Sequence, residues 1–494
     1  MEPNQRGIAR TGSGVPGLDE LLSGGLVAGR MYLVSGAPGT GKTTVGFHFL
    51  EEGLEEGETV LYIHGEESSA EVLENAGQFG IDITDARFLD LGPDSTFFTD
   101  DPSYDLVAPG DVEEDRYTRE IHGAIEEIDP SRVFLDPITQ LRYVETSEHH
   151  YRKRLLSFMR FLKERGITVV TTATTDASRE SDMEVRSLSD GVIRLTRDHD
   201  DRRIEVEKHR GVGQTDGTHG LEIRSSGIEV FPQLVPGPKS RPFDPTPLES
   251  GIDELDTLTG GGFERGTVTF ISGPPGVGKT TVGTQFLTRA ADRGQRGVIY
   301  LFEEREETLR HRCRSIGIDV DGPVEDGSLA VRAIDPQSLS AEEFGHDVRT
   351  RVEAGAEVVM IDGVGGYTSA LKGDEATLQR KLQTLARYLV HHEVSVFVTD
   401  SMRRITGVSS VTGAEISPAA DNLLFLSYLE SNGMLRRVIG VLKKRAGDFE
   451  DTIREFEITT DGIRIGEPMR QYGDVLRGGT RPPGDPDTAG RSER

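Results

Sequence analysis

Short apolar runs that end in small or charged residues recur along the chain, and each run in the first half has a counterpart in the second. Runs of this length, separated by stretches of helical periodicity, predict buried strands that alternate with helices. This alternation predicts an α/β fold in which each half forms a mostly parallel, twisted sheet with helices on both faces. The predicted strands are Arg30–Ser35, Val60–Glu67, 132–136 and Ile167–Thr175 in the first half, and Thr267–Ser272, Val298–Glu304, 357–362 and Val394–Ser401 in the second.

The repeat divides the chain into two domains. A length of 494 residues suits two domains better than one. A proline-rich stretch, QLVPGPKSRPFDPTP, separates the two halves, and a tail rich in glycine and proline closes the chain. We therefore expect domains at 1–232 and 248–470, a linker at 233–247 and a disordered tail at 471–494.

Each half carries one glycine-rich loop of the pattern G-x-x-x-x-G-K-[ST]. GAPGTGKT spans Gly36–Thr43 and GPPGVGKT spans Gly273–Thr280, and each follows a predicted strand and opens a predicted helix. Backbone N–H groups of such a loop bind nucleotide phosphates, the lysine adds a positive charge, and the threonine hydroxyl faces Mg²⁺. The predicted nucleotide-binding residues are Gly36, Gly39, Thr40, Gly41, Lys42, Thr43 and Thr44 in the first half, and Gly273, Gly276, Val277, Gly278, Lys279, Thr280 and Thr281 in the second.

Carboxylates end the strands that should neighbour these loops. Asp136 and Asp362 each close an apolar strand, where a carboxylate would hold Mg²⁺ together with Thr43 or Thr280. A pair of glutamates ends another strand in each half, and its first member follows the loop lysine by 24 residues both times. A carboxylate at that place can activate water for attack on a phosphate, although a glutamate pair can also be a solvated strand end. The candidate bases are Glu66, Glu67, Glu303 and Glu304, and either member of a pair could serve.

A K-x-R triplet follows the nucleotide-binding core of each half. Lys208 and Arg210 align with Lys443 and Arg445 at a constant offset of 235. Alternate residues of a strand share one face, so both cations could reach a phosphate held by a neighbouring subunit. The alternative interpretation is an edge strand that its charges protect from aggregation.

Composition limits the partners and the compartment. The net charge is −28, from 84 acidic and 56 basic residues, and such a field opposes non-specific binding to nucleic acid. This acidic, lysine-poor composition resembles that of proteins from halophilic archaea. A single cysteine is compatible with a reducing cytoplasm, and neither a secretory signal nor a membrane-spanning run is predicted.

These motifs together resemble the KaiC family, the double-domain branch of RecA-like ATPases. The resemblance covers about residues 10–465, and the segments that carry it are GLDELLSGG, GAPGTGKTT, EVLENAGQFGID, RVFLDPIT, LSDGVIRL, EKHRG and GIEVFP in the first half, and GIDELDTLTGGG, GPPGVGKTT, FEE, MIDG and LKKRAG in the second.

The resemblance implies a double-ring homo-hexamer that hydrolyses ATP with Mg²⁺ at its subunit interfaces and has a regulatory, clock-like role. It implies that the glutamate pairs are catalytic and that the K-x-R residues contact the nucleotide of the next subunit. Arg437 matches a further contact of that kind, and Gln78 matches a residue that flanks the nucleotide of the first domain.

Three positions depart from the family pattern. Clock members phosphorylate themselves on adjacent serine and threonine residues, which align here with Ser417 and Pro418. Proline has no hydroxyl, so Ser417 alone remains as an acceptor. Pro137 and Gly363 follow the strand-end aspartates where the family usually has serine, which should alter hydrogen bonding there without removing metal binding.

Two other functions remain open. RecA-like relatives also act as DNA recombination or repair ATPases, but SMRRITG (401–407) is the nearest basic loop and carries only one Arg-Arg pair. The chain could also be a scaffold that binds ATP to assemble and scarcely hydrolyses it, although the intact glutamates argue against this interpretation.

Overall fold

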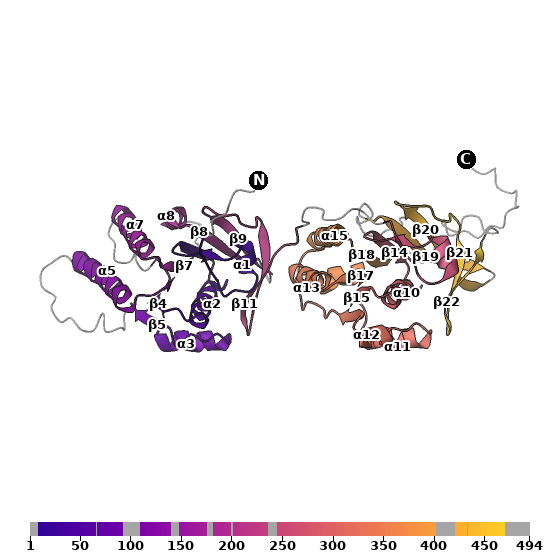
Figure 1. The fold of residues 1–494 in the computed structure, drawn as a ribbon, viewed down its shortest axis with the longest axis horizontal. Coiled ribbons are helices and arrows are strands. Elements are labelled where there is room, and N and C mark those ends of the chain that lie inside the picture. Colours follow the sequence, from indigo (N-terminus) through magenta and orange to yellow (C-terminus); the bar gives the residue numbers. More distant parts are fainter. Residues whose placement is uncertain are drawn as a thin grey trace, which may run out of the picture. The chain divides into compact units, whose positions relative to one another are not determined.

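The structure is a computed structural model that describes residues 8–65, 67–91, 109–139, 148–174, 181–198, 201–235, 245–401, 420–431 and 433–469. Glu66 and Ser417 lie outside these ranges, as do much of the predicted linker and the predicted tail. The chain folds into two compact units, Met1–Gln233 and Leu234–Arg494, and each is described by itself (Figure 1).

The first unit is built from alternating strands and helices. Its helices are α1 (Leu18–Leu21), α2 (Lys42–Glu55), α3 (Ser69–Gln78), α5 (Pro109–Ile128), α7 (Glu148–Glu164) and α8 (Ser181–Leu188). Its strands are β1 (Arg10–Thr11), β2 (Leu26–Val27), β3 (Met31–Gly36), β4 (Val60–His64), β5 (Arg87–Asp90), β6 (Arg132–Asp136), β7 (Thr168–Thr174), β8 (Gly191–Asp198), β9 (Asp201–His209), β10 (Thr218–Arg224) and β11 (Gly227–Phe231).

The second unit repeats this order. Its helices are α9 (Asp253–Leu258), α10 (Lys279–Asp292), α11 (Glu306–Ser315), α12 (Asp321–Glu325), α13 (Ala341–Glu353), α14 (Val364–Ala370) and α15 (Glu375–His391). Its strands are β12 (Pro247–Leu248), β13 (Phe263–Glu264), β14 (Val268–Gly273), β15 (Arg296–Leu301), β16 (Leu329–Ala333), β17 (Ala356–Asp362), β18 (Ser395–Ser401), β19 (Asn422–Ser431), β20 (Met434–Lys444), β21 (Arg454–Thr459) and β22 (Gly462–Pro468).

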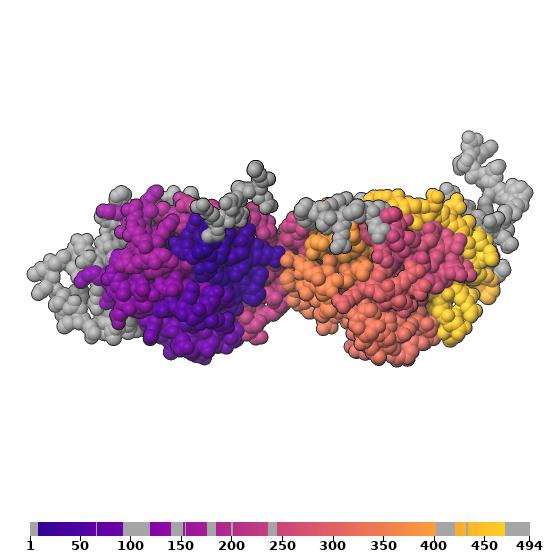
Figure 2. Space-filling view, in the orientation of Figure 1, coloured from indigo at the N-terminus to yellow at the C-terminus, as the bar shows by residue number. Residues whose placement is uncertain are grey.

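The two large sheets have the same topology. Over the described residues, the first has the order β11-β10-β9-β8-β3-β7-β6-β4-β5 and the second the order β22-β21-β20-β19-β14-β18-β17-β15-β16. Six strands in each are parallel, from β8 to β5 and from β19 to β16, and the remaining three are antiparallel. The structure therefore confirms the predicted α/β class. In the second unit the antiparallel strands β21 and β22, coloured yellow, cover one end of the unit (Figures 1 and 2).

Each sheet is buried on both faces because alternate residues of its central strands enter different cores. In β3, Tyr32 and Val34 pack with α1, α2 and α3, whereas Met31 and Leu33 pack with α5 and α7. The second sheet divides in the same way, with α9, α10 and α11 on one face and α13, α14 and α15 on the other (Figure 1). Because the six strands of each sheet are parallel, their carboxyl ends all lie at one edge of the sheet. The glycine loops follow β3 and β14 and therefore lie at that edge.

A buried histidine distinguishes the first unit from the second. His48 on α2 is 6% exposed, and its Nε2 accepts the backbone N–H of Ile228 at 2.9 Å. Burial lowers the pKa of His48 to about 4, because an imidazolium would lose its hydration and this hydrogen bond. The corresponding residue of α10, 237 positions later, is Gln285, which does not titrate.

We expect acid to destabilise the first unit through His48. Its folded pKa lies below the ordinary value of 6.5, so its contribution to stability is complete above pH 6.5 and is lost as the pH falls toward 4. The free energy of unfolding should fall by roughly 3 kcal/mol over this window. His48→Gln should remove that part of the pH dependence in denaturant titrations of the full chain. An unchanged pH profile in the variant would contradict this assignment.

Candidate functional site

Both glycine loops join the central strand of a sheet to the amino end of a helix. The last loop glycines, Gly41 and Gly278, have left-handed backbones (φ 99° and 115°), and no side chain caps either helix among the described residues. A Cβ at Gly41 would lie 2.8 Å from Ile228, so this position needs glycine for two reasons. The first backbone N–H groups of α2 and α10 are therefore uncapped, as a phosphate site requires.

The other loop residues divide into contact and packing positions. Thr40 donates to the carbonyl oxygen of Ala37 at 2.8 Å and holds the loop closed. Thr44, Thr281 and Val277 are buried, so their side chains pack inward, and only their backbones could bind a ligand. The sequence pattern does not distinguish these three positions from the loop residues whose side chains can contact a ligand.

A threonine hydroxyl from the loop meets the strand-end aspartate in both units. Thr43 donates to Asp136 at 2.7 Å, and Thr280 donates to the two oxygens of Asp362 at 2.9 and 3.0 Å. A second hydroxyl, from the neighbouring strand, also binds each carboxylate: Thr172 in β7 and Thr399 in β18. These oxygen atoms form the donor set that the predicted magnesium sites require.

Burial shapes the charges of the second site. Lys279 is 9% exposed and donates to the carbonyl oxygens of Gly273 and Pro274 at 2.9 and 3.2 Å. Burial lowers the pKa of Lys279, and the carboxylates of Asp362, Glu303 and Asp400 oppose this shift. Burial also raises the pKa of Asp362 to about 6, against the hydrogen bonds from Thr399 and Thr280. A cation at this site would favour the ionised form of Asp362.

The two members of the second glutamate pair have different surroundings. Glu304 is held by Arg312 of α11 through two hydrogen bonds of 2.8 Å. Glu303 is exposed, and no hydrogen bond or ion pair joins it to another residue of the described ranges. In the first unit, Glu67 accepts from Asn75 of α3 at 3.0 Å, which repeats the spacing of eight residues between Glu304 and Arg312. The second glutamates are thus tied to a helix, whereas Glu303 faces the loop edge.

Gly363 lies against Glu303. Its φ is 97°, and a Cβ built there would lie 2.8 Å from Oε1 of Glu303. Any side chain at this position would therefore displace Glu303 or strain the backbone. The serine that the family usually carries here would not fit this arrangement.

The K-x-R residues lie at the opposite end of the strands from the loop of their own unit. Lys208 pairs in register with Val192, which pairs with Leu33 near the start of β3, and Lys443 has the same place beside β19. The loop begins at Gly36, three residues or roughly 10 Å farther along β3 than Leu33. These cations are therefore remote from the glycine loop of their own unit.

The lysine and the arginine of each triplet are held differently. Lys208 donates to the carbonyl oxygens of Arg186 and Ser187 near the end of α8, and Lys443 donates to that of Ala420. Arg210 and Arg445 each come one residue after the end of a strand, β9 or β20. The prediction that the lysine and the arginine of each triplet share one face of a strand is therefore wrong. The Arg210 and Arg445 side chains are 57% and 60% exposed, 3.9 Å from Asp190 and 2.9 Å from Asp421.

Arg437 and Gln78, the two further residues that the family resemblance implies, lie away from the K-x-R residues. Arg437 is in the middle of β20, and its guanidinium lies over the ring of Tyr428, 6.0 Å from the centroid. The Tyr428 hydroxyl would lie 3.5 Å from a Cβ at Gly276, so this pair is on the loop side of its own unit, away from Lys443 and Arg445. Gln78 is the exposed last residue of α3.

Sequence reasoning missed several residues that shape the site. Thr172 and Thr399 occupy the same place in matched strands, a repetition that could have revealed them. Asn75 and Arg312 follow the second glutamates by eight residues, but their types differ, which conceals the relation. Asp400, 6% exposed beside Thr399, corresponds to Ala173 in the first unit and had no pattern to mark it.

Comparison with known proteins identifies the family. The family model for the KaiC ATPase matches residues 11–235 and 248–470, one match for each unit. This chain belongs to the KaiC ATPase family.

Curated relatives align along nearly the whole chain. The circadian clock oscillator protein KaiC of Parathermosynechococcus lividus is 28% identical over 96% of this chain and 88% of its own length. The circadian clock protein KaiC3 of Synechocystis sp. is 28% identical over 96% of this chain and 94% of its own length. KaiC of Parasynechococcus marenigrum is 27% identical over 96% and 93%.

Within the described ranges, every helix is too short or too polar to cross a membrane.

We expect Gly363→Ala to impair the second unit specifically. A methyl group there would push Glu303 from its place, and phosphate release by that unit should fall roughly tenfold or more. The measurement uses chains in which Lys42→Ala silences the first loop. Gly365→Ala is the matched control, because its Cβ would lie 3.9 Å from Glu303, an ordinary contact. Equal rates in the two variants would refute the role of Gly363.

Proposed function

We propose that this protein is a ring-forming tandem ATPase of the cytoplasm in which both units hydrolyse ATP and the neighbouring subunit completes each site. The observation that carries the proposal is the division of each unit into two ends. The loop, the threonine–aspartate pair and a glutamate lie at one end of the parallel strands, and an exposed arginine lies at the other.

The uncapped amino ends of α2 and α10 would bind the ATP phosphates. Lys279 now satisfies its ammonium group with two loop carbonyl oxygens, and phosphate oxygens would take their place. Lys42 donates to the carbonyl oxygen of Ala37 at 3.0 Å and would act in the same way. This exchange supports phosphate binding, because a buried ammonium group gains charged acceptors in place of neutral ones.

The residues present fit a magnesium ion. Thr43 with Asp136 and Thr280 with Asp362 would hold it, and it would supply positive charge to the phosphate oxygens. The hydroxyls of Thr172 and Thr399 orient the two carboxylates, which is the usual part of residues behind a metal ligand.

Glu303 is the proposed base of the second unit, and its counterpart Glu66 that of the first. The carboxylate would orient a water molecule and accept its proton while the water oxygen attacks the γ-phosphorus and the bond to ADP breaks. Glu304 and Glu67 would position the strand end, because Arg312 and Asn75 already engage their carboxylates.

Arg210 and Arg445 are the proposed trans-acting fingers. An arginine so far from the loop of its own unit can reach a γ-phosphate only across an interface between subunits. Lys208 and Lys443 would position these arginines, because both lysines are anchored to backbone carbonyl oxygens. The intersubunit contacts proposed for Arg437 and Gln78 rest on the family resemblance alone.

A regulatory, clock-like role is proposed from the named relatives, which are circadian clock proteins. The proposal that the ring is a homo-hexamer rests on the family resemblance. We propose autophosphorylation at Ser417 as an additional activity, with one acceptor in place of two because residue 418 is proline.

Hydrolysis should depend on Glu303 far more than on Glu304. In chains silenced at Lys42, Glu303→Gln should lower phosphate release from γ-labelled ATP at high salt at least about a hundredfold, because a proton acceptor is lost. Glu304→Gln should lower it less than about tenfold, because glutamine still accepts from Arg312.

Label retained on the protein and absent in Ser417→Ala would establish the kinase activity.

Two outcomes would overturn this assignment. A low rate of turnover that neither substitution changes would indicate a scaffold that binds ATP to assemble and scarcely hydrolyses it. Loss of turnover only in Glu304→Gln would move the base to the second glutamate.

A further inference from the structure

The middle residue of each K-x-R triplet is buried directly before the proposed arginine finger. His209 precedes Arg210 and is 6% exposed, and Lys444 precedes Arg445 with a side chain that is 2% exposed. Side chains this deeply buried do not touch a nucleotide in a neighbouring subunit. Any effect that they have on hydrolysis therefore passes through the arginine that follows.

A chain of hydrogen bonds fixes His209 in the first unit. The backbone N–H of Val27 donates to the hydroxyl oxygen of Tyr32 at 2.7 Å. The hydroxyl hydrogen of Tyr32 is then available for Nε2 of His209, which lies 3.0 Å away. The other ring nitrogen, Nδ1, carries the hydrogen and donates to the carbonyl oxygen of Gly213 at 3.3 Å. The neutral imidazole thus satisfies both of its nitrogens, and these partners assign its tautomer.

A glycine makes room for the contact between Tyr32 and His209. Tyr32 of β3, Gly191 of β8 and His209 of β9 are paired in register across three adjacent strands. A Cβ at Gly191 would lie 2.2 Å from the Tyr32 ring. The ring can therefore cross β8 and reach His209 only because the strand between them has no side chain at this position.

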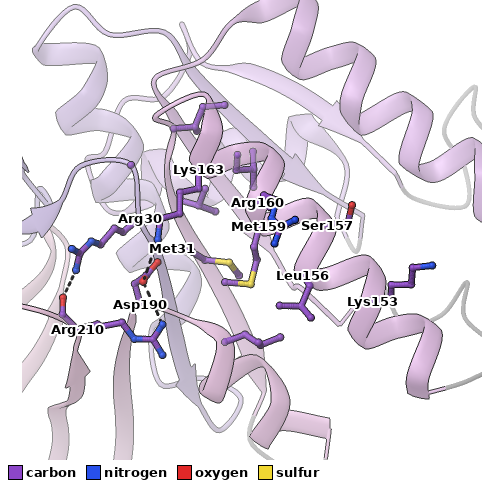
Figure 3. A pocket seen from close by; sticks show the side chains of 15 residues that line it. Arg30, Met31, Lys153, Leu156, Ser157, Met159, Arg160, Lys163, Asp190 and Arg210 are labelled. Carbon is purple, nitrogen blue, oxygen red and sulfur yellow. Dashed lines mark hydrogen bonds and ion pairs between the residues drawn. The ribbon is translucent and has the colours of Figure 1, made fainter.

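The backbone is also fixed on both sides of Arg210. Its N–H donates to the carbonyl oxygen of Asp190 at 2.9 Å, and its carbonyl oxygen accepts from the guanidinium of Arg30. Figure 3 shows the Arg30 contact and the ion pair between Arg210 and Asp190 as dashed lines. The exposed side chain of Arg210 consequently extends from a backbone that is held at the residue itself and at His209.

A buried ion pair takes the place of this hydrogen-bond chain in the second unit. Nζ of Lys444 lies 3.0 Å from a carboxylate oxygen of Glu264 and donates to the carbonyl oxygen of Thr259 at 2.9 Å. Glu264 ends β13 as Val27 ends the matching strand β2. The two arginines are therefore anchored by different chemistry, and only the anchor of the first unit contains an imidazole.

We propose that His209 is the positioning residue of Arg210 and that only its neutral form holds the arginine in place, so that acid weakens this finger and spares Arg445. The inference rests on the proposed role of Arg210 at the nucleotide of the neighbouring subunit. An imidazolium would direct a second N–H at Tyr32, whose hydroxyl hydrogen would then lose its acceptor in a buried place.

The surroundings of His209 favour the neutral ring. Burial lowers the pKa of His209 below its ordinary value of 6.5, and the hydrogen bond from Nδ1 to the backbone opposes this shift. Among the described residues, the charged groups that act on the ring beside Tyr32 are Arg10 of β1 and Arg30, and both lower the pKa further. The anchored form is therefore complete above pH 6.5 and is lost as the pH falls through the folded pKa.

A double-mutant cycle tests the positioning role in full chains in which Lys279→Ala silences the second loop. Tyr32→Phe removes the hydroxyl that holds His209, and it should lower kcat roughly tenfold while KM changes less than about twofold, since the finger acts in the transition state. In chains that also carry Arg210→Ala, Tyr32→Phe should lower kcat less than about twofold, because no arginine remains to be misplaced.

The pH dependence gives a second readout that needs no variant of the anchor. The ratio of kcat with Arg210 to kcat with Arg210→Ala cancels the groups that titrate in both chains. This ratio should fall progressively toward one as the pH drops below 6.5. The matched control is the ratio for Arg445 and Arg445→Ala in chains silenced by Lys42→Ala, which should stay constant. Unfolding curves at each pH would define the range in which the chains remain folded.

The outcomes separate this inference from the proposed function. Full activity in Arg210→Ala would refute the finger role itself. Slow hydrolysis by Arg210→Ala together with full activity in Tyr32→Phe would overturn the role of His209 alone. An equal loss of kcat from Tyr32→Phe with and without Arg210 would show a structural defect instead of positioning. A ratio for Arg210 that does not change with pH would show that the charge of His209 has no influence on the finger.

Discussion

The hydrogen bond between the loop threonine and the strand-end aspartate is the contact on which each site depends. It joins the amino end of α2 or α10 to the neighbouring end of β6 or β17, two elements far apart in the sequence. It keeps the hydroxyl and the carboxylate together before any ligand binds, and a second threonine fixes the carboxylate from the other side. Preorganisation of this kind reduces the free energy needed to order the groups when a cation arrives.

The two units share this contact but differ in burial. Lys279 and Asp362 are buried, whereas Lys42 and Asp136 are half-buried. The second site also holds the additional carboxylate of Asp400 near Lys279, where the first has Ala173. Electrostatic interactions are stronger in the drier surroundings of the second site, so the two sites should differ in nucleotide affinity and turnover although their motifs match.

The sequence was sufficient for the parts of the structure that repeat. The loops, the strand-end aspartates and the α/β class followed from patterns of spacing, because backbone geometry imposes them. The difference between Glu303 and Glu304 could not be predicted, since it arises from Arg312, a residue of another helix. The inward direction of Val277 and Thr281, the pressure of Gly363 on Glu303 and the hydrogen bond between Tyr32 and His209 likewise depend on tertiary packing. No repeat in the sequence marks those contacts, because they form only when distant segments pack together.

The claim that a neighbouring subunit completes each site is tested most directly by mixing two inactive chains. One carries Arg445→Ala and the other Lys279→Ala, both with the first loop silenced by Lys42→Ala, and phosphate release is measured after co-assembly. A mixed interface pairs an intact loop with an intact arginine, so activity should return to roughly a quarter of that of the chain silenced at the first loop alone. A mixture no more active than either chain alone would show that Arg445 does not act across the interface.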